Sequence, residues 1–131
     1  MVIIGGRGQS AVEFMIVFGA MLFFFTIFFI VIQESIYENS REERNILAND
    51  IALSVKEEIL LAHESSEGYM RSFYVPLNIY GLDYGINLSE GHVYLYSEKI
   101  GISYIVSDVS GNIVKGNNTI RKEGGTIYLN Q

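Results

Sequence analysis

Residues 11–32 of the chain read AVEFMIVFGAMLFFFTIFFIVI, an almost unbroken apolar run. Only Glu13, Gly19 and Thr26 interrupt it, and no charged residue occurs from 14 to 32. A helix of this length rises roughly 30 Å, which matches the hydrocarbon core of a bilayer. Because it is apolar all round, it requires lipid or protein on every side. A chain of 131 residues has little left to cover such a helix, so we expect a membrane span.

The apolar run does not have the layout of an ordinary secretory signal. Such a signal has an apolar stretch of about 7–15 residues, followed by a cleavage site of small residues. This run is longer, and it ends in Val31-Ile32-Gln33-Glu34, without an A-x-A pattern. We therefore expect the helix to be retained.

A short motif precedes the run, and it reads Gly5-Gly6-Arg7-Gly8-Gln9-Ser10-Ala11-Val12-Glu13-Phe14. It resembles the class III signal peptide of archaeal type IV pilin-like proteins, in which a short basic leader and a Gly precede Q-x-S-x-E-F. Gly8, Gln9, Glu13 and Phe14 match that pattern, whereas Ala11 stands where the family usually has Ser. The segment is also similar to the start of Tad-type pseudopilins, and the resemblance covers roughly residues 5–35.

The resemblance implies cleavage between Gly8 and Gln9 by a prepilin-type leader peptidase at the cytoplasmic side of the membrane. Glu13 would then be the fifth residue of the chain and, with Phe14, an assembly residue. A carboxylate at the edge of lipid is costly without a partner, and the new α-amino group of a neighbouring subunit's Gln9 would supply one. The alternative is that Glu13 lies at the headgroup level, favoured by the dipole of the helix start.

Residues 33–67 predict a continuation of the helix in amphipathic form. The segment has no Gly or Pro up to Ser66, and apolar residues recur every three or four positions at Leu47, Ile51, Val55, Ile59 and Ala62. This face is flanked by three further apolar residues, Ile46, Leu53 and Leu60. The solvent side carries charged residues: Glu38, Arg41, Glu42, Glu43, Arg44, Lys56, Glu57 and Glu58. We expect one continuous helix from about Ser10 to Ser66, ended by Glu67-Gly68.

Residues 68–131 predict a small β-rich head. Short alternating segments are separated by Gly and Asn, and Pro76 is the only proline. The predicted strands are 73–79, 84–88, 92–97, 102–107, 112–115, 119–122 and 126–130. Predicted turns include Ser110-Gly111-Asn112 and Gly116-Asn117-Asn118. A sheet this small requires a partner surface, and the amphipathic helix offers one.

Charge predicts the orientation. The leader carries Arg7 and no acidic residue, so we expect the N-terminus in the cytoplasm and the head outside, on a single span of the cytoplasmic membrane. Two N-glycosylation sequons fall in the head and make Asn87 and Asn117 candidate acceptors: Asn87-Leu88-Ser89 and Asn117-Asn118-Thr119.

No residue pattern predicts catalysis, a cofactor or a metal site. The net charge of -6 argues against nucleic acid as a partner, and the chain contains no Cys. His63 and His92 lack metal-ligand spacing, and we expect the nine Tyr to pack in and along the strands.

The sequence therefore predicts an α+β protein with a leader (1–8), a transmembrane and assembly helix (9–32), an amphipathic continuation (33–67) and an extracytoplasmic antiparallel β head (68–131). The expected function is that of a pilin-like or pseudopilin subunit in a surface filament or short pseudopilus. The chain is small for an abundant adhesive pilin, which favours a minor or accessory subunit. The expected partners are membrane lipid, related subunits and the leader peptidase. The alternative is a single-span anchor that displays a binding or stator-like head without polymerising.

Overall fold

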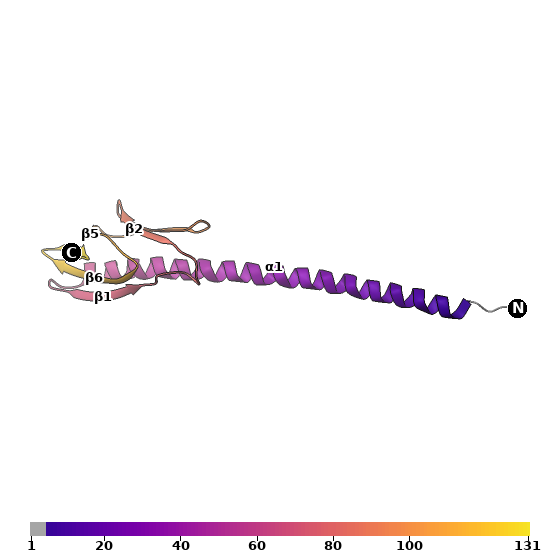
Figure 1. Ribbon diagram of the computed structural model, residues 1–131. Helices are drawn as coiled ribbons and strands as arrows, with labels where there is room; N and C mark the ends of the chain where they lie inside the picture. The colour runs from indigo at the N-terminus through magenta and orange to yellow at the C-terminus, as the bar shows by residue number, and fades with distance from the viewer. Residues whose placement is uncertain (1–4) are drawn as a thin grey trace. The chain divides into compact units, whose positions relative to one another are not determined.

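The computed structural model describes residues 5–131. The first four residues of the predicted leader, and the side chain of Arg7, lie outside this description. A single helix, α1 (Gly5–Glu64), is followed by seven strands (Figure 1). The chain forms two compact units, residues 1–41 and 42–131, and α1 contributes to both. The fold is α+β, as predicted.

Helix α1 begins five residues earlier than predicted and ends two residues earlier. Its C-terminal end is held by Lys122, whose Nζ donates hydrogen bonds to the carbonyl oxygens of His63 (2.7 Å) and Ser65 (2.8 Å). A cation at this end satisfies carbonyl groups that have no partner within the helix. Gly68, at φ +83°, then supplies a left-handed conformation that other residues rarely adopt.

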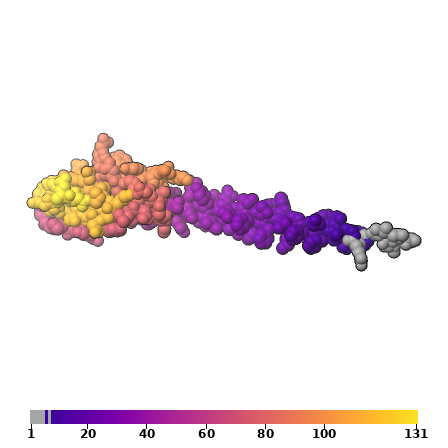
Figure 2. Space-filling view, in the orientation of Figure 1, coloured from indigo at the N-terminus to yellow at the C-terminus, as the bar shows by residue number. Residues whose placement is uncertain are grey.

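In the first unit, α1 is exposed on every side. All the large apolar side chains between Val12 and Ile32 are at least 40% exposed, and Figure 2 shows this segment in indigo and violet. Among residues 5–131, α1 is the one helix that is long and apolar enough to cross a membrane. Its first half is thus a candidate membrane span, as the composition predicted.

In the second unit, one face of α1 is buried under the strands. The predicted residues Ile51, Val55, Ile59 and Ala62 are buried, together with Ala48 and Ala52, while Leu47 is partly buried. The flanking Ile46 and Leu60 are exposed, as are most of the predicted solvent-side charges. Glu58 differs from the prediction: only 15% of its side chain is exposed, because it turns toward Arg71 at 3.5 Å.

The strands form two sheets instead of the predicted single small sheet. The larger sheet has the order β1-β6-β7-β5 and consists of β1 (Met70–Val75), β6 (Gly116–Glu123), β7 (Thr126–Leu129) and β5 (Val109–Gly111). The smaller has the order β2-β3-β4 and consists of β2 (Gly85–Ser89), β3 (His92–Tyr96) and β4 (Gly101–Ile105). Neighbouring strands are antiparallel except for β5 and β7, which are parallel.

The predicted strand at 112–115 is wrong. Strand β5 lies at Val109–Gly111 and overlaps the predicted turn, and residues 112–115 form a loop. The reason is the buried side chain of Asn118, which accepts a hydrogen bond from the Val114 amide (3.0 Å) and donates one to the Val114 carbonyl (2.8 Å). These bonds occupy the groups that a ladder would use. The predicted turn at 116–118 is likewise wrong, because these residues begin β6.

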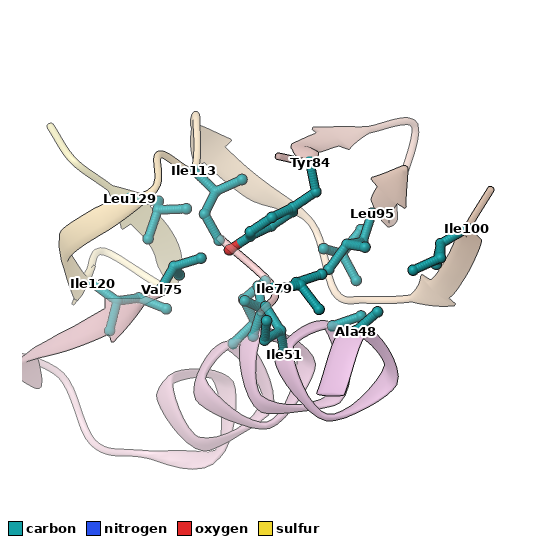
Figure 3. Close-up of a cluster of buried hydrophobic side chains, with 14 of the residues drawn as sticks. Ala48, Ile51, Val75, Ile79, Tyr84, Leu95, Ile100, Ile113, Ile120 and Leu129 are labelled. Atoms are coloured by element: carbon teal, nitrogen blue, oxygen red, sulfur yellow. The ribbon is translucent and has the colours of Figure 1, made fainter. Parts of the chain in front are cut away.

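The two sheets and α1 enclose one core. Figure 3 shows side chains from both sheets and the connecting loops meeting the face of α1 at Ala48 and Ile51. The loop after β1 contributes Ile79, and the 112–115 loop contributes Ile113. Strand β1 ends at Val75 because Pro76 cannot continue the ladder. The predicted strand 73–79 is therefore displaced, since β1 begins three residues and ends four residues earlier than predicted.

Candidate assembly helix and glycosylation sites

The predicted processing and assembly residues lie on the first turns of α1, and Gln9 and Glu13 are one helical turn apart. Gln9 Nε2 donates a hydrogen bond to Glu13 Oε1 at 3.3 Å, and both side chains are exposed. Gly8 has no neighbouring atom within 4 Å of the position a Cβ would take. The bond orients the carboxylate toward the start of the helix, where the positive end of the dipole favours it.

Phe14, the other predicted assembly residue, is largely exposed on the surface of α1. Its side chain is 66% exposed, and its ring stacks on Phe18 at 5.9 Å between centroids. Aromatic rings of this size are costly to leave in water, and a bilayer or a second helix would cover them.

The two other interruptions of the apolar run are compatible with lipid. The Thr26 hydroxyl donates to the Leu22 carbonyl at 2.8 Å, so this polar group is satisfied by its own helix. Gly19 has open space around its Cα and breaks neither the helix nor any packing contact. Neither residue therefore requires water within the span.

The two predicted acceptor asparagines, Asn87 and Asn117, are exposed and lie on strands. Asn87 is in β2 and faces Tyr94 of β3 as its direct cross-strand partner. Asn117 is in β6 and faces Tyr74 of β1 in the same way. Sequence reasoning did not associate these tyrosines with the sequons. The two-residue turn Glu90-Gly91 could have indicated the first pairing, whereas nothing local indicates the second.

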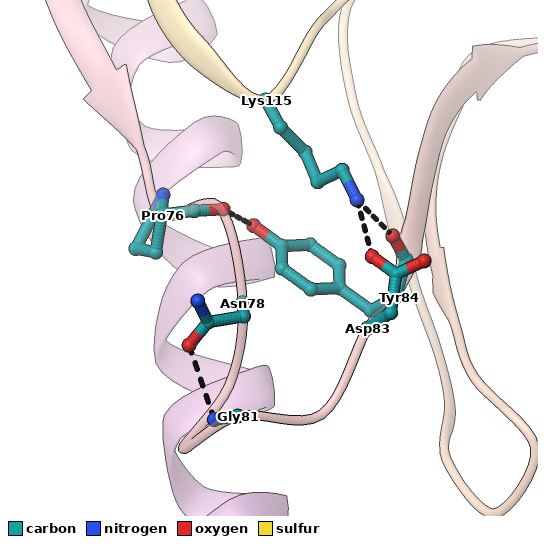
Figure 4. A network of polar contacts seen from close by, with 6 residues as sticks. All are labelled: Pro76, Asn78, Gly81, Asp83, Tyr84 and Lys115. Atoms are coloured by element: carbon teal, nitrogen blue, oxygen red, sulfur yellow. Dashed lines mark hydrogen bonds and ion pairs between the residues drawn. The ribbon is translucent and has the colours of Figure 1, made fainter.

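A polar network closes the loop between β1 and β2 (Figure 4). Lys115 Nζ donates to Asp83 Oδ1 (2.6 Å) and to the Tyr84 carbonyl (3.0 Å), and the Tyr84 hydroxyl donates to the Pro76 carbonyl. The hydrogen bond and positive charge of Lys115 lower the pKa of Asp83. Burial raises the pKa of Tyr84 to about 12. These contacts hold the loop to the core.

The histidines are not brought together. His63 lies at the end of α1, and His92 stacks on Tyr94 with its Nδ1 3.0 Å from the Glu90 carbonyl. Within residues 5–131, no three His, Cys, Asp or Glu side chains gather in a way that could hold a metal ion.

Comparison with protein families, with curated proteins and with solved structures finds no match to this chain.

Proposed function

We propose that the chain is a pilin-like or pseudopilin subunit that is inserted in the membrane and assembled through its N-terminal helix. The observation that carries the proposal is the combination at the start of α1. An apolar helix exposed on all sides follows a single carboxylate, Glu13, which is one turn from the predicted new N-terminus at Gln9. The assembly would be a surface filament or a short pseudopilus, with this chain as a minor or accessory subunit.

Cleavage after Gly8 would turn Gln9 into a terminal residue with a free α-amino group. Its side-chain amide already contacts Glu13 within the chain, but an amide is neutral and compensates little of the carboxylate's charge. An unpaired ion near the hydrocarbon layer costs several kcal/mol. Pairing with the α-amino group of an adjacent subunit would remove this cost and would align the two helices.

The expected orientation has the N-terminus in the cytoplasm and the head outside. Arg7 before the span supports it, and processing by a cytoplasmic leader peptidase would require the same orientation. Beyond the span, the exposed acids Glu34, Glu38, Glu42 and Glu43 give α1 a solvated surface.

The alternative function is a monomeric anchor that displays the head. The two functions differ in the need for Glu13, because an anchor requires only the apolar run. They also differ in processing, since an anchor has no need to lose residues 1–8.

The first test is the intact mass of the protein recovered from membranes. We expect a chain that begins at Gln9, and a full-length chain would count against pilin-type processing.

The second test compares Glu13→Gln with Glu34→Gln. Glu13→Gln keeps a hydrogen-bond acceptor for Gln9 but removes the charge, whereas Glu34 lies beyond the apolar run and serves as the matched control. We expect both variants to insert in the membrane, and only Glu13→Gln to be lost from filaments seen by electron microscopy. Normal incorporation of Glu13→Gln would refute the assembly role and favour the anchor.

A further inference from the structure

Both sequons share one arrangement in the folded head. In each, the asparagine and the hydroxyl residue two positions later lie on the outer face of an antiparallel pair, since alternate residues of a strand point the same way. An exposed tyrosine stands directly opposite each asparagine: Tyr94 opposite Asn87, and Tyr74 opposite Asn117. Such partners are within contact distance across the strands.

The amides of Asn87 and Asn117 are available. Neither side chain forms a hydrogen bond with another residue in the described part of the chain. Asn118, between Asn117 and Thr119, is in contrast buried and bonded to the Val114 and Gly116 backbone. Because the middle residue of the second sequon, Asn118, is held in the core, its neighbour Asn117 points outward.

The surface around Asn87 suits a neutral, hydroxyl-rich ring. Strands β2, β3 and β4 contain no Asp, Glu, Lys or Arg. A shallow groove of about 350 Å³ is lined by residues of all three strands, among them Asn87, Tyr94, Tyr96, Gly101 and Ser103. The Tyr96 ring lies over Gly85, in the space that a Cβ would occupy, and is 56% exposed.

We propose that Asn87 and Asn117 both carry N-linked glycans, and that Tyr94 and Tyr74 each contact the first sugar of the glycan opposite. The proposal rests on the outside orientation given above for the head. The occupant of the groove is therefore the chain's own Asn87-linked sugar. The tyrosine ring meets the apolar C–H face of the sugar, while the sugar hydroxyl groups stay in water.

The modification requires a lipid-phosphate-linked sugar donor and a transferase of the host cell. The asparagine Nδ2 forms a bond with the anomeric carbon as the bond from that carbon to the phosphate oxygen breaks. The amide nitrogen loses one proton, and the lipid phosphate leaves with the bonding electrons. No oxidant or reductant takes part.

The site assignment is tested on the full chain purified from the cells that make it. Trypsin separates the sequons into residues 72–99 and 116–121. We expect a sugar mass on both peptides. Ser89→Ala should remove it from the first alone and Thr119→Ala from the second alone, while Ser89→Thr and Thr119→Ser should retain both.

Protease added to intact cells distinguishes the two ways in which this test can fail. If the protease cleaves the head and the sequon peptides carry no sugar, the glycan proposal is refuted and the proposed function is unaffected. If the head is not cleaved by the protease, the expected orientation is refuted, and with it both the glycan proposal and the proposed function.

The role of the tyrosines is tested with a double-mutant cycle. It measures whether the effect of losing the glycan on the thermal midpoint of the detergent-solubilised chain depends on the tyrosine. Loss of the glycan through Ser89→Ala should lower the midpoint by about 4 °C when Tyr94 is present and by less than about 1 °C beside Tyr94→Ser. Tyr80→Ser is the control, because Tyr80 is 62% exposed and faces no sequon, so it should leave the 4 °C effect unchanged. Equal losses beside Tyr94 and Tyr94→Ser overturn the sugar contact.

Discussion

Replacing Asn118 by Ala should destabilise the head strongly. Asn118 is 1% exposed and, aromatic residues aside, is the one buried polar residue among those whose burial the structure describes. It takes part in four hydrogen bonds: with the Val114 amide (3.0 Å), the Val114 carbonyl (2.8 Å), the Gly116 carbonyl (3.1 Å) and Asn130 Nδ2 (2.7 Å). They connect the 112–115 loop to β6 and to the end of β7.

The size of the effect follows from these bonds. Each net hydrogen bond contributes about 0.5–1.5 kcal/mol, so four give about 2–6 kcal/mol. Because the groups of Val114 and Asn130 can regain hydrogen bonds to water, we expect the lower half of this range, about 3 kcal/mol. For a domain of this size, about 3 kcal/mol corresponds to a fall of roughly 12–24 °C in the thermal midpoint.

The assay is thermal and urea unfolding of unglycosylated chain, followed by circular dichroism in detergent. Asn117→Ala is the matched control, because this neighbour is exposed and has no side-chain hydrogen bond among the described residues. It should change the free energy of unfolding by less than about 0.5 kcal/mol. A similar, small effect of both substitutions would refute the view that Asn118 determines the loop.

Two further perturbations test the packing of the head. Gly111→Ala should destabilise it by more than about 2 kcal/mol in urea unfolding, because φ is +107° and a Cβ would lie 2.0 Å from the Leu129 carbonyl oxygen. Gly125→Ala, at φ +76° but with open space, should cost about 1 kcal/mol, and equal losses would contradict a steric role for the β5–β7 contact. Raising the pH should leave the Tyr84 contribution intact up to its unfolded pKa near 10 and then destabilise the head up to pH 12, because burial in the fold raises the pKa of this phenol to about 12. Tyr84→Phe should therefore lose less stability than the parent between pH 10 and 12 in thermal scans, and an identical loss would show that Tyr84 is not responsible.

The helix and its buried face were predictable because both depend on local information. Continuous apolarity defines the candidate span, and a repeat of three to four residues defines the face with Ile51, Val55 and Ile59. Ala48 and Ala52 were not part of that prediction, since their burial depends on how closely the strands approach α1.

The sheet arrangement was less predictable because it depends on contacts far apart in the chain. Hairpins such as β2–β3 follow from a short turn, but the pairing of β1 with β6 and of β5 with β7 has no local signal. Gly111 and Asn118 both indicated turns in the sequence, but both lie in strands. Gly111 packs closely against the Leu129 carbonyl, and the Asn118 side chain is hydrogen-bonded to Val114.

For the candidate site, the motif predicted the positions of Gly8, Gln9, Glu13 and Phe14, and all of them lie on α1. Their assembly role stays a prediction. The hydrogen bond between Gln9 and Glu13 follows from helical spacing and could have been anticipated, whereas the tyrosines facing the sequons depend on strand register.

The order of the strands has a consequence for biogenesis. Strand β1 follows α1 in the chain and is synthesised soon after it. Its partner β6 begins more than forty residues later, and β7 later still. Until then the face with Ile51, Val55 and Ile59 has no β6 or β7 to cover it, because long-range pairs cannot form before both strands exist. The apolar run has by that time already left the ribosome. Under the proposed orientation, insertion of the candidate span would therefore come before folding of the head, and the head would cross the membrane unfolded.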